Sequence, residues 1–360
     1  MKTRIGLRRI GDPSLALRIL VPILSVLCAF IFCAILFQVM GYNSLQIYGK
    51  LLESAFTSVY GIQDTLVYSI TLMFCALGIS IAFKMKIWNI GAEGQICLGA
   101  LFSTGAALFC PWIPEPLLLP AVIVAGFIGG ALWAIISILP NALWGVNETI
   151  ITLLMNYVAI FLINYFVYGP WRDPEGLNFP LTAKVPECTR LPKLFGTNIH
   201  AGFILAVVLA VILYFVLKRT SWGYQISVTG QNRLAAVYGG INVKRNIVLV
   251  MLLSGGICGL AGMAQITGIT LRMQPDLSGG YGYMAITIAY LSRFNPLLVV
   301  IVSILFGGLV NGGFSLQMIG LPSEVVTMMQ GAILFFVLGG EFFCRYSLYL
   351  KKDNKEGELT

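Results

Sequence analysis

Long apolar runs, each close to the length that crosses a lipid bilayer, follow one another along almost the whole chain. A membrane-spanning helix needs about 20 mostly apolar residues. Because hydrocarbon offers no hydrogen-bond partner to a free backbone, spans of this length must be helices. We therefore expect an all-α, polytopic membrane protein, with one transmembrane domain over residues 1–360 and about ten transmembrane helices. The expected spans are residues 19–40, 65–83, 96–110, 117–139, 149–168, 199–217, 247–269, 283–291, 296–310 and 325–339.

The composition supports a chain dissolved in lipid. Of its 360 residues 58% are apolar and 11% are charged, whereas soluble domains carry about a quarter charged residues. The net charge of +8 is spread over short basic clusters between apolar runs. This distribution is typical of the positive-inside pattern, so we expect membrane lipid and no nucleic acid as a partner.

The basic clusters also orient the chain. Most Lys and Arg residues fall on one side of the membrane if both termini are cytoplasmic, as the positive-inside rule requires. The sequence then predicts a cytoplasmic N-terminal tail (1–18), an extracytoplasmic loop (171–198), a cytoplasmic loop (218–246) and a cytoplasmic C-terminal tail (342–360).

Two segments of similar sequence suggest a possible inverted repeat. Residues 148–152 (ETIIT) lead to Asn156, and residues 324–327 (EVVT) lead to Gln330. With ten spans these segments run in opposite directions, as they do in transporters with inverted repeats. Chance similarity between helices rich in Leu and Gly explains the match equally well.

A polar segment, residues 88–95, separates the second apolar run from the third. Its glycines allow the backbone to leave helical geometry, which near the membrane is tolerated where a cavity or other protein satisfies the freed groups. We interpret this segment as a broken helix that borders a translocation path, and an interfacial loop is the alternative. Polar residues of later spans could line the same path, and the alternative for them is that their amides join helices. The candidate substrate-pathway residues are Asn89, Glu93, Gln95, Asn156 and Gln265.

The cytoplasmic loop 218–246 is longer than a connection between two helices needs. Asn232 suits a helix N-cap and Gly239 a helix stop, which predicts a short helix over 233–238. A rigid helix here could transmit motion from a soluble ATPase to the spans, although a plain connecting loop is the alternative. The candidate ATPase-coupling residues are Gln231, Asn232, Arg233, Ala235, Ala236 and Gly239.

The sequence lacks motifs for chemistry of its own. It has no GxxxxGK[ST] phosphate loop, no nucleophile elbow or HExxH motif, and a single histidine, His200. We therefore expect no catalytic residue, no metal site and no cofactor, with ATP hydrolysed by a partner subunit. Proton-coupled carriers keep a carboxylate or His at mid-depth, and Glu148, Arg293 and Glu324 fall at span ends, which disfavours an ion-coupled secondary carrier. A membrane-embedded enzyme ranks last.

Motifs over residues 60–340 resemble one family of transport proteins. They include 89–95 (NIGAEGQ), 146–157 (VNETIITLLMNY), 169–174 (GPWRDP), 230–242 and 280–283 (GYGY). In order and spacing they are similar to the permeases of bacterial ABC importers of the ribose/simple-sugar and nucleoside group. The first and third motifs look more like the nucleoside type.

The resemblance implies a permease subunit in the bacterial cytoplasmic (inner) membrane that moves a nucleoside, with purines favoured, by alternating access. It implies three protein partners: a cytoplasmic ABC ATPase, a second homologous permease or a second copy, and an extracytoplasmic substrate-binding lipoprotein. It also places the ATPase contact in residues 230–242. The alternatives are a permease for a simple sugar or another small polar solute, and an ion-coupled carrier.

Overall fold

The computed structural model describes residues 3–9, 15–176, 178–194, 196–318, 320–322 and 324–352. The chain forms two compact units. We call residues 50–319 the central unit and residues 1–49 with 320–360 the terminal unit.

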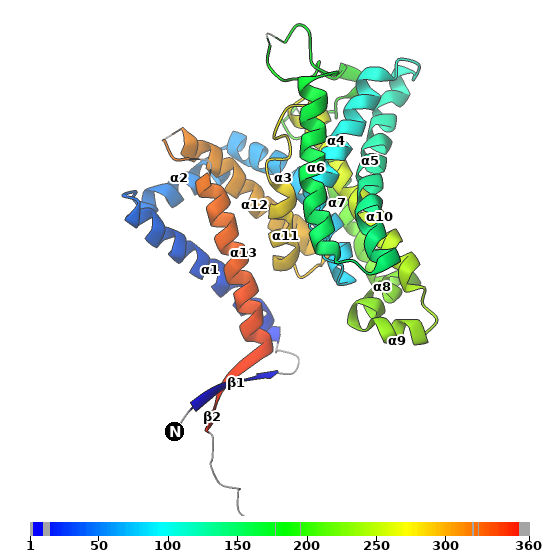
Figure 1. The fold of residues 1–360 in the computed structure, drawn as a ribbon. Helices are drawn as coiled ribbons and strands as arrows, with labels where there is room; N and C mark the ends of the chain where they lie inside the picture. Colours follow the sequence, from blue (N-terminus) through cyan, green and yellow to red (C-terminus); the bar gives the residue numbers. More distant parts are fainter. Residues whose placement is uncertain are drawn as a thin grey trace, which may run out of the picture. The chain divides into compact units, whose positions relative to one another are not determined.

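Helices make up most of both units (Figure 1). In the terminal unit Ser44 and Tyr48 of α2 donate hydrogen bonds to carbonyl groups of α1. Helix α13 packs along α1, and two short strands pair. The α2 helix begins in this unit and ends in the central one. The elements outside the central unit, with α2, are β1 (Thr3–Arg9), α1 (Leu15–Val39), α2 (Ser44–Phe56), α13 (Glu324–Arg345) and β2 (Tyr346–Lys352).

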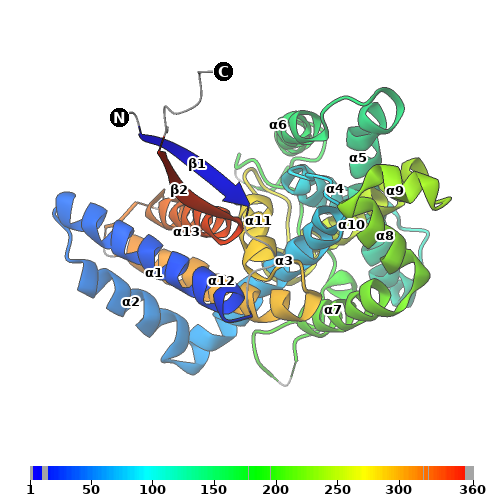
Figure 2. The ribbon, with the colours of Figure 1, turned by 90° about the horizontal axis from the view of Figure 1, so that it is seen from below.

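The central unit is a helical bundle. Its elements are α3 (Val59–Lys84), α4 (Ala92–Phe109), α5 (Glu115–Trp144), α6 (Glu148–Tyr168), η1 (Glu187–Thr189), α7 (Gly202–Arg219), α8 (Ser221–Gln231), α9 (Arg233–Tyr238), α10 (Val243–Ala264), the π-helical turn η2 (Gln265–Ile269), α11 (Tyr281–Leu291) and α12 (Pro296–Gln317). Helix α10 packs against α3, α4 and α5, while α11 and α12 pack on α3 and α6 packs on α4 and α5 (Figure 2). The most deeply buried spans are therefore α3 and α10.

Glycines explain how closely α10 approaches its neighbours. A Cβ on Gly99 of α4 would lie 2.2 Å from the carbonyl oxygen of Gly259, and one on Gly130 of α5 would lie 2.2 Å from that of Gly255. Small residues permit such backbone contact between helices in a membrane. Gly99 and Gly130 therefore allow α4 and α5 to pack closely on α10.

Seven of the described helices are long and apolar enough to cross a membrane: α1, α3, α5, α6, α7, α10 with η2, and α12. The other three predicted spans coincide with α4, α11 and α13. Helix α11 has 11 residues, which at a rise of 1.5 Å per residue gives about 16 Å, half the hydrocarbon thickness. The full count of ten and the inverted repeat, whose two segments fall in α6 and α13, stay predictions.

The terminal segments differ from the expectation of helices and tails alone. Strand β1 pairs with β2 in antiparallel register from Thr3↔Lys352 to Arg9↔Tyr346. Ile5 and Leu7 in β1, and Leu348 and Leu350 in β2, stand two positions apart, which is the period of a strand. The basic residues within them led us to expect plain tails, and α13 also continues to Arg345, past the expected end of the last span.

The segment between α7 and α10 holds two helices. Helix α9 has the predicted bounds, and the Asn232 side chain caps it by accepting hydrogen bonds from Leu234 N (2.9 Å) and Ala235 N (3.1 Å). Helix α8 was not predicted, although Thr220 caps it by accepting from Gly223 N at 3.1 Å. Figure 1 shows α8 and α9 at the end of the central unit opposite the loop of residues 171–198.

Candidate functional site

The chain leaves helical geometry between α3 and α4, over residues 85–91. Asn89 is fully buried in this break. Its Oδ1 accepts hydrogen bonds from Gly91 N (3.0 Å) and Gln95 Nε2 (3.1 Å), and its Nδ2 donates to Gln95 Oε1 (3.2 Å) and Ser254 Oγ (3.0 Å). The Asn89 amide thus joins the break to α4 and α10.

Asn156 of α6 lies against the same break and is also fully buried. Its Oδ1 accepts from Gly94 N at 2.9 Å, and its Nδ2 donates to Ile90 O at 2.9 Å and to the Tyr283 hydroxyl at 3.2 Å. One amide therefore connects α6, the break and α11.

Glu93, at the start of α4, has a side chain 3% exposed. Its two carboxylate oxygens accept hydrogen bonds from Gly280 N (2.9 Å) and Gly282 N (2.7 Å), at the N-terminus of α11. Gly280, the N-cap residue, has φ +77° and no side chain that could cap the helix. Glu93 supplies the cap from another helix, and its negative charge suits the positive end of the α11 dipole.

Gln265 lies apart from this cluster. It is the first residue of the π-helical turn at the end of α10, and its Oε1 accepts a hydrogen bond from Thr71 Oγ1 of α3 at 3.1 Å. A π-helical turn often marks a functional position in a helix. The structure thus brings Asn89, Glu93, Gln95 and Asn156 together and places Gln265 elsewhere on the buried face of α10.

The structure also shows partners that sequence analysis missed, namely Thr71, Ser254 and Tyr283. A hydroxyl inside an apolar run signals a hydrogen bond to another element. The sequence could have pointed to Ser254, which precedes the Gly255–Gly256 pair of α10, but not to the amide it meets 165 positions away.

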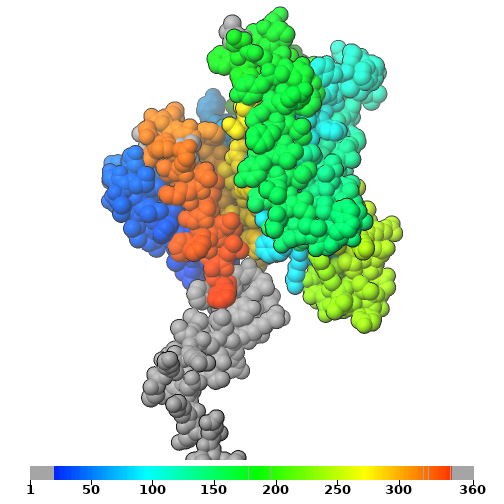
Figure 3. Space-filling model, viewed as in Figure 1, coloured from blue at the N-terminus to red at the C-terminus, as the bar shows by residue number. Residues whose placement is uncertain are grey.

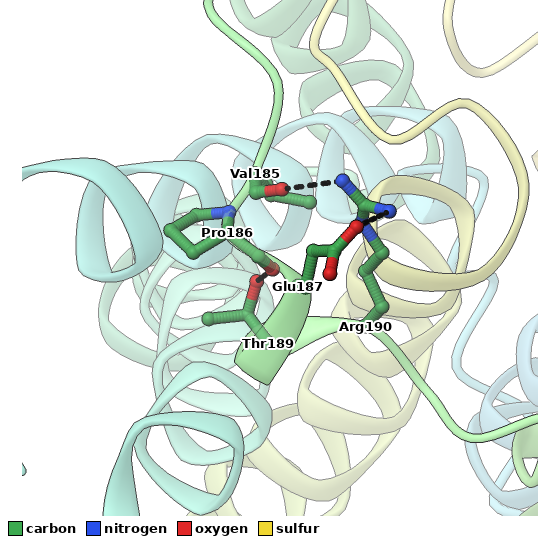
Figure 4. A network of polar contacts seen from close by, with 5 residues as sticks. All are labelled: Val185, Pro186, Glu187, Thr189 and Arg190. Atoms are coloured by element: carbon green, nitrogen blue, oxygen red, sulfur yellow. Dashed lines mark hydrogen bonds and ion pairs between the residues drawn. The ribbon is translucent and has the colours of Figure 1, made fainter. Parts of the chain in front are cut away.

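The loop of residues 171–198 is attached to the end of α10. Val185 N donates to Leu271 O at 3.0 Å, and Leu191 N donates to Thr267 O at 3.1 Å. Between these anchors, Arg190 forms an ion pair with Glu187 at 3.1 Å and Thr189 Oγ1 donates to Pro186 O at 2.7 Å (Figure 4). The described part of the loop is thus hydrogen-bonded to the segment that follows Gln265.

The six candidate coupling residues gather around α9. Ala236 is fully buried, whereas Gln231, Asn232, Arg233, Ala235 and Gly239 are exposed. Sequence analysis missed three large residues of the same helix that face outward: Leu234, Val237 and Tyr238, exposed by 73%, 60% and 92%. Three apolar residues exposed on six residues of helix form a surface suited to a protein partner.

The arrangement is that of a polytopic transport protein whose polar interior is built from amides, hydroxyls and one capped carboxylate. Residues 61–338 match the family described as "Branched-chain amino acid transport system / permease component", and the chain belongs to this family. It is the permease subunit of an ABC importer, a multi-pass membrane protein and not a catalytic subunit. The family expected from the sequence is confirmed.

Relatives in this family differ in the solute that their names give. The chain is 32% identical to the glucose ABC transporter permease protein TsgB13 of Haloferax volcanii, over 93% of this chain and 90% of the relative. It is 28% identical to the nucleoside permease NupB of Lactococcus lactis, over 95% and 96%. It is 29% identical to the guanosine permease NupP of Bacillus subtilis, over 89% and 92%.

Proposed function

We propose that this permease moves a neutral nucleoside, with purine nucleosides favoured, across the bacterial cytoplasmic membrane by alternating access. The nucleoside-type resemblance of 89–95 and the nucleoside and guanosine relatives support this solute. The observation that carries the proposal is the break between α3 and α4, which is held by the Asn89 and Asn156 amides. Transporters bind solutes where discontinuous helices free backbone and side-chain polar groups to face the path.

The polar chemistry at this break suits an uncharged solute. Asn89, Gln95 and Asn156 contribute neutral amides, and the Glu93 carboxylate is occupied by two backbone N–H groups. A charged solute in a membrane needs a nearby opposite charge. The charged group of this cluster, Glu93, is already bound by Gly280 N and Gly282 N. We assign Asn89, Glu93, Gln95, Asn156 and Gln265 to the pathway.

In this proposal α9 is the contact with a cytoplasmic ABC ATPase. Its exposed apolar surface supports that role. The basic residues Arg219, Arg233, Lys244 and Arg245 around it support a cytoplasmic location for this end. The chain then has ten spans, both termini inside and the 171–198 loop outside, facing a substrate-binding lipoprotein. A second homologous permease, or a second copy, completes the path. ATP binding and hydrolysis shift the balance between outward-open and inward-open states.

A hexose is the second candidate solute, because the glucose permease of Haloferax volcanii has the higher identity at 32%. Amides and hydroxyls bind sugar hydroxyls as well as base edges. The polar groups at the break therefore fit both solutes.

Reconstitution tests the proposal. The permease is purified with its partner ATPase and substrate-binding lipoprotein, placed in proteoliposomes, and supplied with ATP and labelled guanosine or glucose. We expect ATP-dependent guanosine uptake that an ATPase unable to hydrolyse ATP abolishes. Uptake of glucose alone would replace the nucleoside by a hexose. Uptake that persists without ATP and collapses with an uncoupler would reject ATP-driven transport.

A further inference from the structure

Helix α6 exposes polar aromatic side chains where other spans expose aliphatic ones. Tyr157 lies midway along α6, about 15 Å from either end at 1.5 Å per residue, and is 54% exposed. The middle turns of three other described spans, α5, α7 and α12, expose Leu, Ile and Val: Val124, Ile128, Leu132, Ile136, Val208, Val211, Ile212, Ile301 and Leu305. Figure 3 shows α6 uncovered on the visible face of the central unit.

Tyr283 of α11 is hydrogen-bonded to the residue that precedes Tyr157 in α6. It is 37% exposed, and its hydroxyl accepts a hydrogen bond from Asn156 Nδ2 at 3.2 Å. Asn156, behind the two rings, uses both polar atoms on protein partners. The two tyrosines are thus the exposed surface of the buried amide cluster.

Neither lipid nor a tightly packed helix suits this surface. A hydroxyl in hydrocarbon without a partner costs free energy, and no interfacial water reaches the middle of a span. Close helix contacts in membranes use small residues, whereas the exposed middle of α6 carries Leu153, Leu154, Tyr157, Val158 and Phe161. A water-filled path satisfies the phenol groups without requiring close approach of another backbone.

We propose that Tyr157 and Tyr283 line the translocation path and contact the solute through their rings, an inference that rests on the proposed transport function. The ligand chemistry is an uncharged ring with an apolar face and a polar rim, as in a nucleobase or a hexose. Phenol rings stack on such faces, and their hydroxyls both donate and accept at the rim. The nearest carboxylate, Glu93, is capped by Gly280 and Gly282, so a zwitterionic amino acid finds no counter-charge here.

Thiol labelling tests the path. In a cysteine-free permease assembled with its ATPase and binding protein, Tyr157→Cys is compared with Ile212→Cys, a mid-helix position of α7 with a matched exposure of 51%. Thiols react as thiolates, which form in water, so a membrane-impermeant, positively charged methanethiosulfonate should modify Tyr157→Cys about tenfold faster than Ile212→Cys. Vesicles of both orientations cover both open states. Equal, slow modification at the two positions would remove Tyr157 from the path.

Protection by solute tests the contact. Guanosine or glucose, added with ATP, should slow modification of Tyr157→Cys. The compound that protects shows whether the path binds a nucleoside or a hexose. Modification that neither compound slows would reject the contact. Failure of the proposed solute is recognised separately, because the cysteine-free parent would then import neither compound while the labelling contrast between the two positions persists.

The conservative variants give a second readout that does not depend on cysteine chemistry. Tyr157→Leu and Tyr283→Phe should each raise the KM for uptake several-fold, whereas Ile212→Leu should leave the KM unchanged. Unchanged KM in both tyrosine variants would overturn the proposal.

Discussion

At the break between α3 and α4, side-chain amides replace hydrogen bonds that a continuous helix would make within its backbone. Gly91 N and Gly94 N donate to Asn89 Oδ1 and Asn156 Oδ1, and Ile90 O accepts from Asn156 Nδ2. An unpaired buried backbone group costs about 1–3 kcal/mol. The amides therefore provide partners for backbone groups that the break leaves without helical hydrogen bonds. A break held by a few side chains can open more readily than a continuous helix.

Glu93→Gln should destabilise the protein. The substituted amide keeps one acceptor and points an NH2 group at a backbone N–H, so one charge-assisted hydrogen bond and the favourable helix-dipole interaction are lost. We expect a loss of about 2 kcal/mol in the free energy of unfolding, measured by thermal unfolding in detergent. Glu53→Gln, at an exposed position of α2, is the matched control and should change little. Equal stability of the two variants would contradict the capping role of Glu93.

His200 should make stability depend on pH. It lies just before α7, outside the span; its Nδ1 accepts from Gly202 N at 3.3 Å, its Nε2 is buried without a partner, and burial lowers the pKa of His200 to about 4. An unfolded histidine titrates near 6.5. As pH falls, the unfolded state binds the proton first, so the free energy of unfolding decreases. The contribution of neutral His200 is complete above pH 6.5 and is lost as pH falls through about 4.

The full loss is on the order of 3 kcal/mol. Since His200 is the sole histidine of the chain, His200→Asn removes all histidine titration. Unfolding measured from pH 7.5 to 4 should show a steeper fall for the wild-type chain than for the variant. Parallel curves would show that His200 does not titrate in this window.

At the scale of elements, the close packing of α10 on its neighbours limits which glycines can be replaced by larger residues. Gly130→Ala places a methyl group 2.2 Å from Gly255 O and 2.7 Å from Gly259 Cα, so α5 and α10 must separate. Overpacking of this kind costs about 1–3 kcal/mol, seen as a lower unfolding temperature. Gly331→Ala, in α13 with nothing within 4 Å of the new Cβ, should instead stabilise by about 0.5–1 kcal/mol. A stabilised Gly130→Ala variant would disprove the contact.

The sequence predicted those elements whose signals are local. The α9 helix followed from an N-cap Asn and a Gly stop, and the seven clear spans from length and hydropathy. Helix α8 was missed because its sequence, SWGYQISVTGQ, has no apolar periodicity that marks one face. Its position is set by tertiary packing: a Cβ on Gly230 would lie 2.3 Å from Lys84 O, at the end of α3.

For the site, residue types could be predicted but their partners could not. Polar side chains inside or beside apolar runs are costly unless they are paired or functional. This reasoning selected Asn89, Glu93, Gln95 and Asn156. Glu93, however, meets Gly280 across 187 positions of sequence, and no periodicity or spacing encodes that pairing. The depth of Tyr157 could not be predicted either, because it depends on where α6 begins and ends.

At the scale of the central unit, α10 connects the two ends that a transporter must coordinate. It begins directly after the α9 segment, and η2 at its other end leads to residues 267–271, which hold the 171–198 loop by backbone hydrogen bonds. A second connection runs from α9 through α8 to the end of α3, beside the break at residues 85–91. Movement of α9 can therefore reach both the outer loop and the polar cluster through rigid helices.

Ala235→Trp should uncouple ATP turnover from uptake. Ala235 is exposed on α9, so the permease fold tolerates a bulky side chain there, but that side chain blocks close docking of the ATPase. A bulky residue at buried Ala236 would disturb both the fold and the docking. We expect uptake in proteoliposomes to fall on the order of tenfold, equivalent to about 1.4 kcal/mol of coupling, while the thermal stability of the purified permease is kept. Ala235→Ser, which adds one hydroxyl and little volume, is the control and should transport normally. Since α9 contacts α8, and α8 contacts α3 beside the break, normal uptake by a well-folded Ala235→Trp variant would mean that the ATPase acts on another part of the bundle.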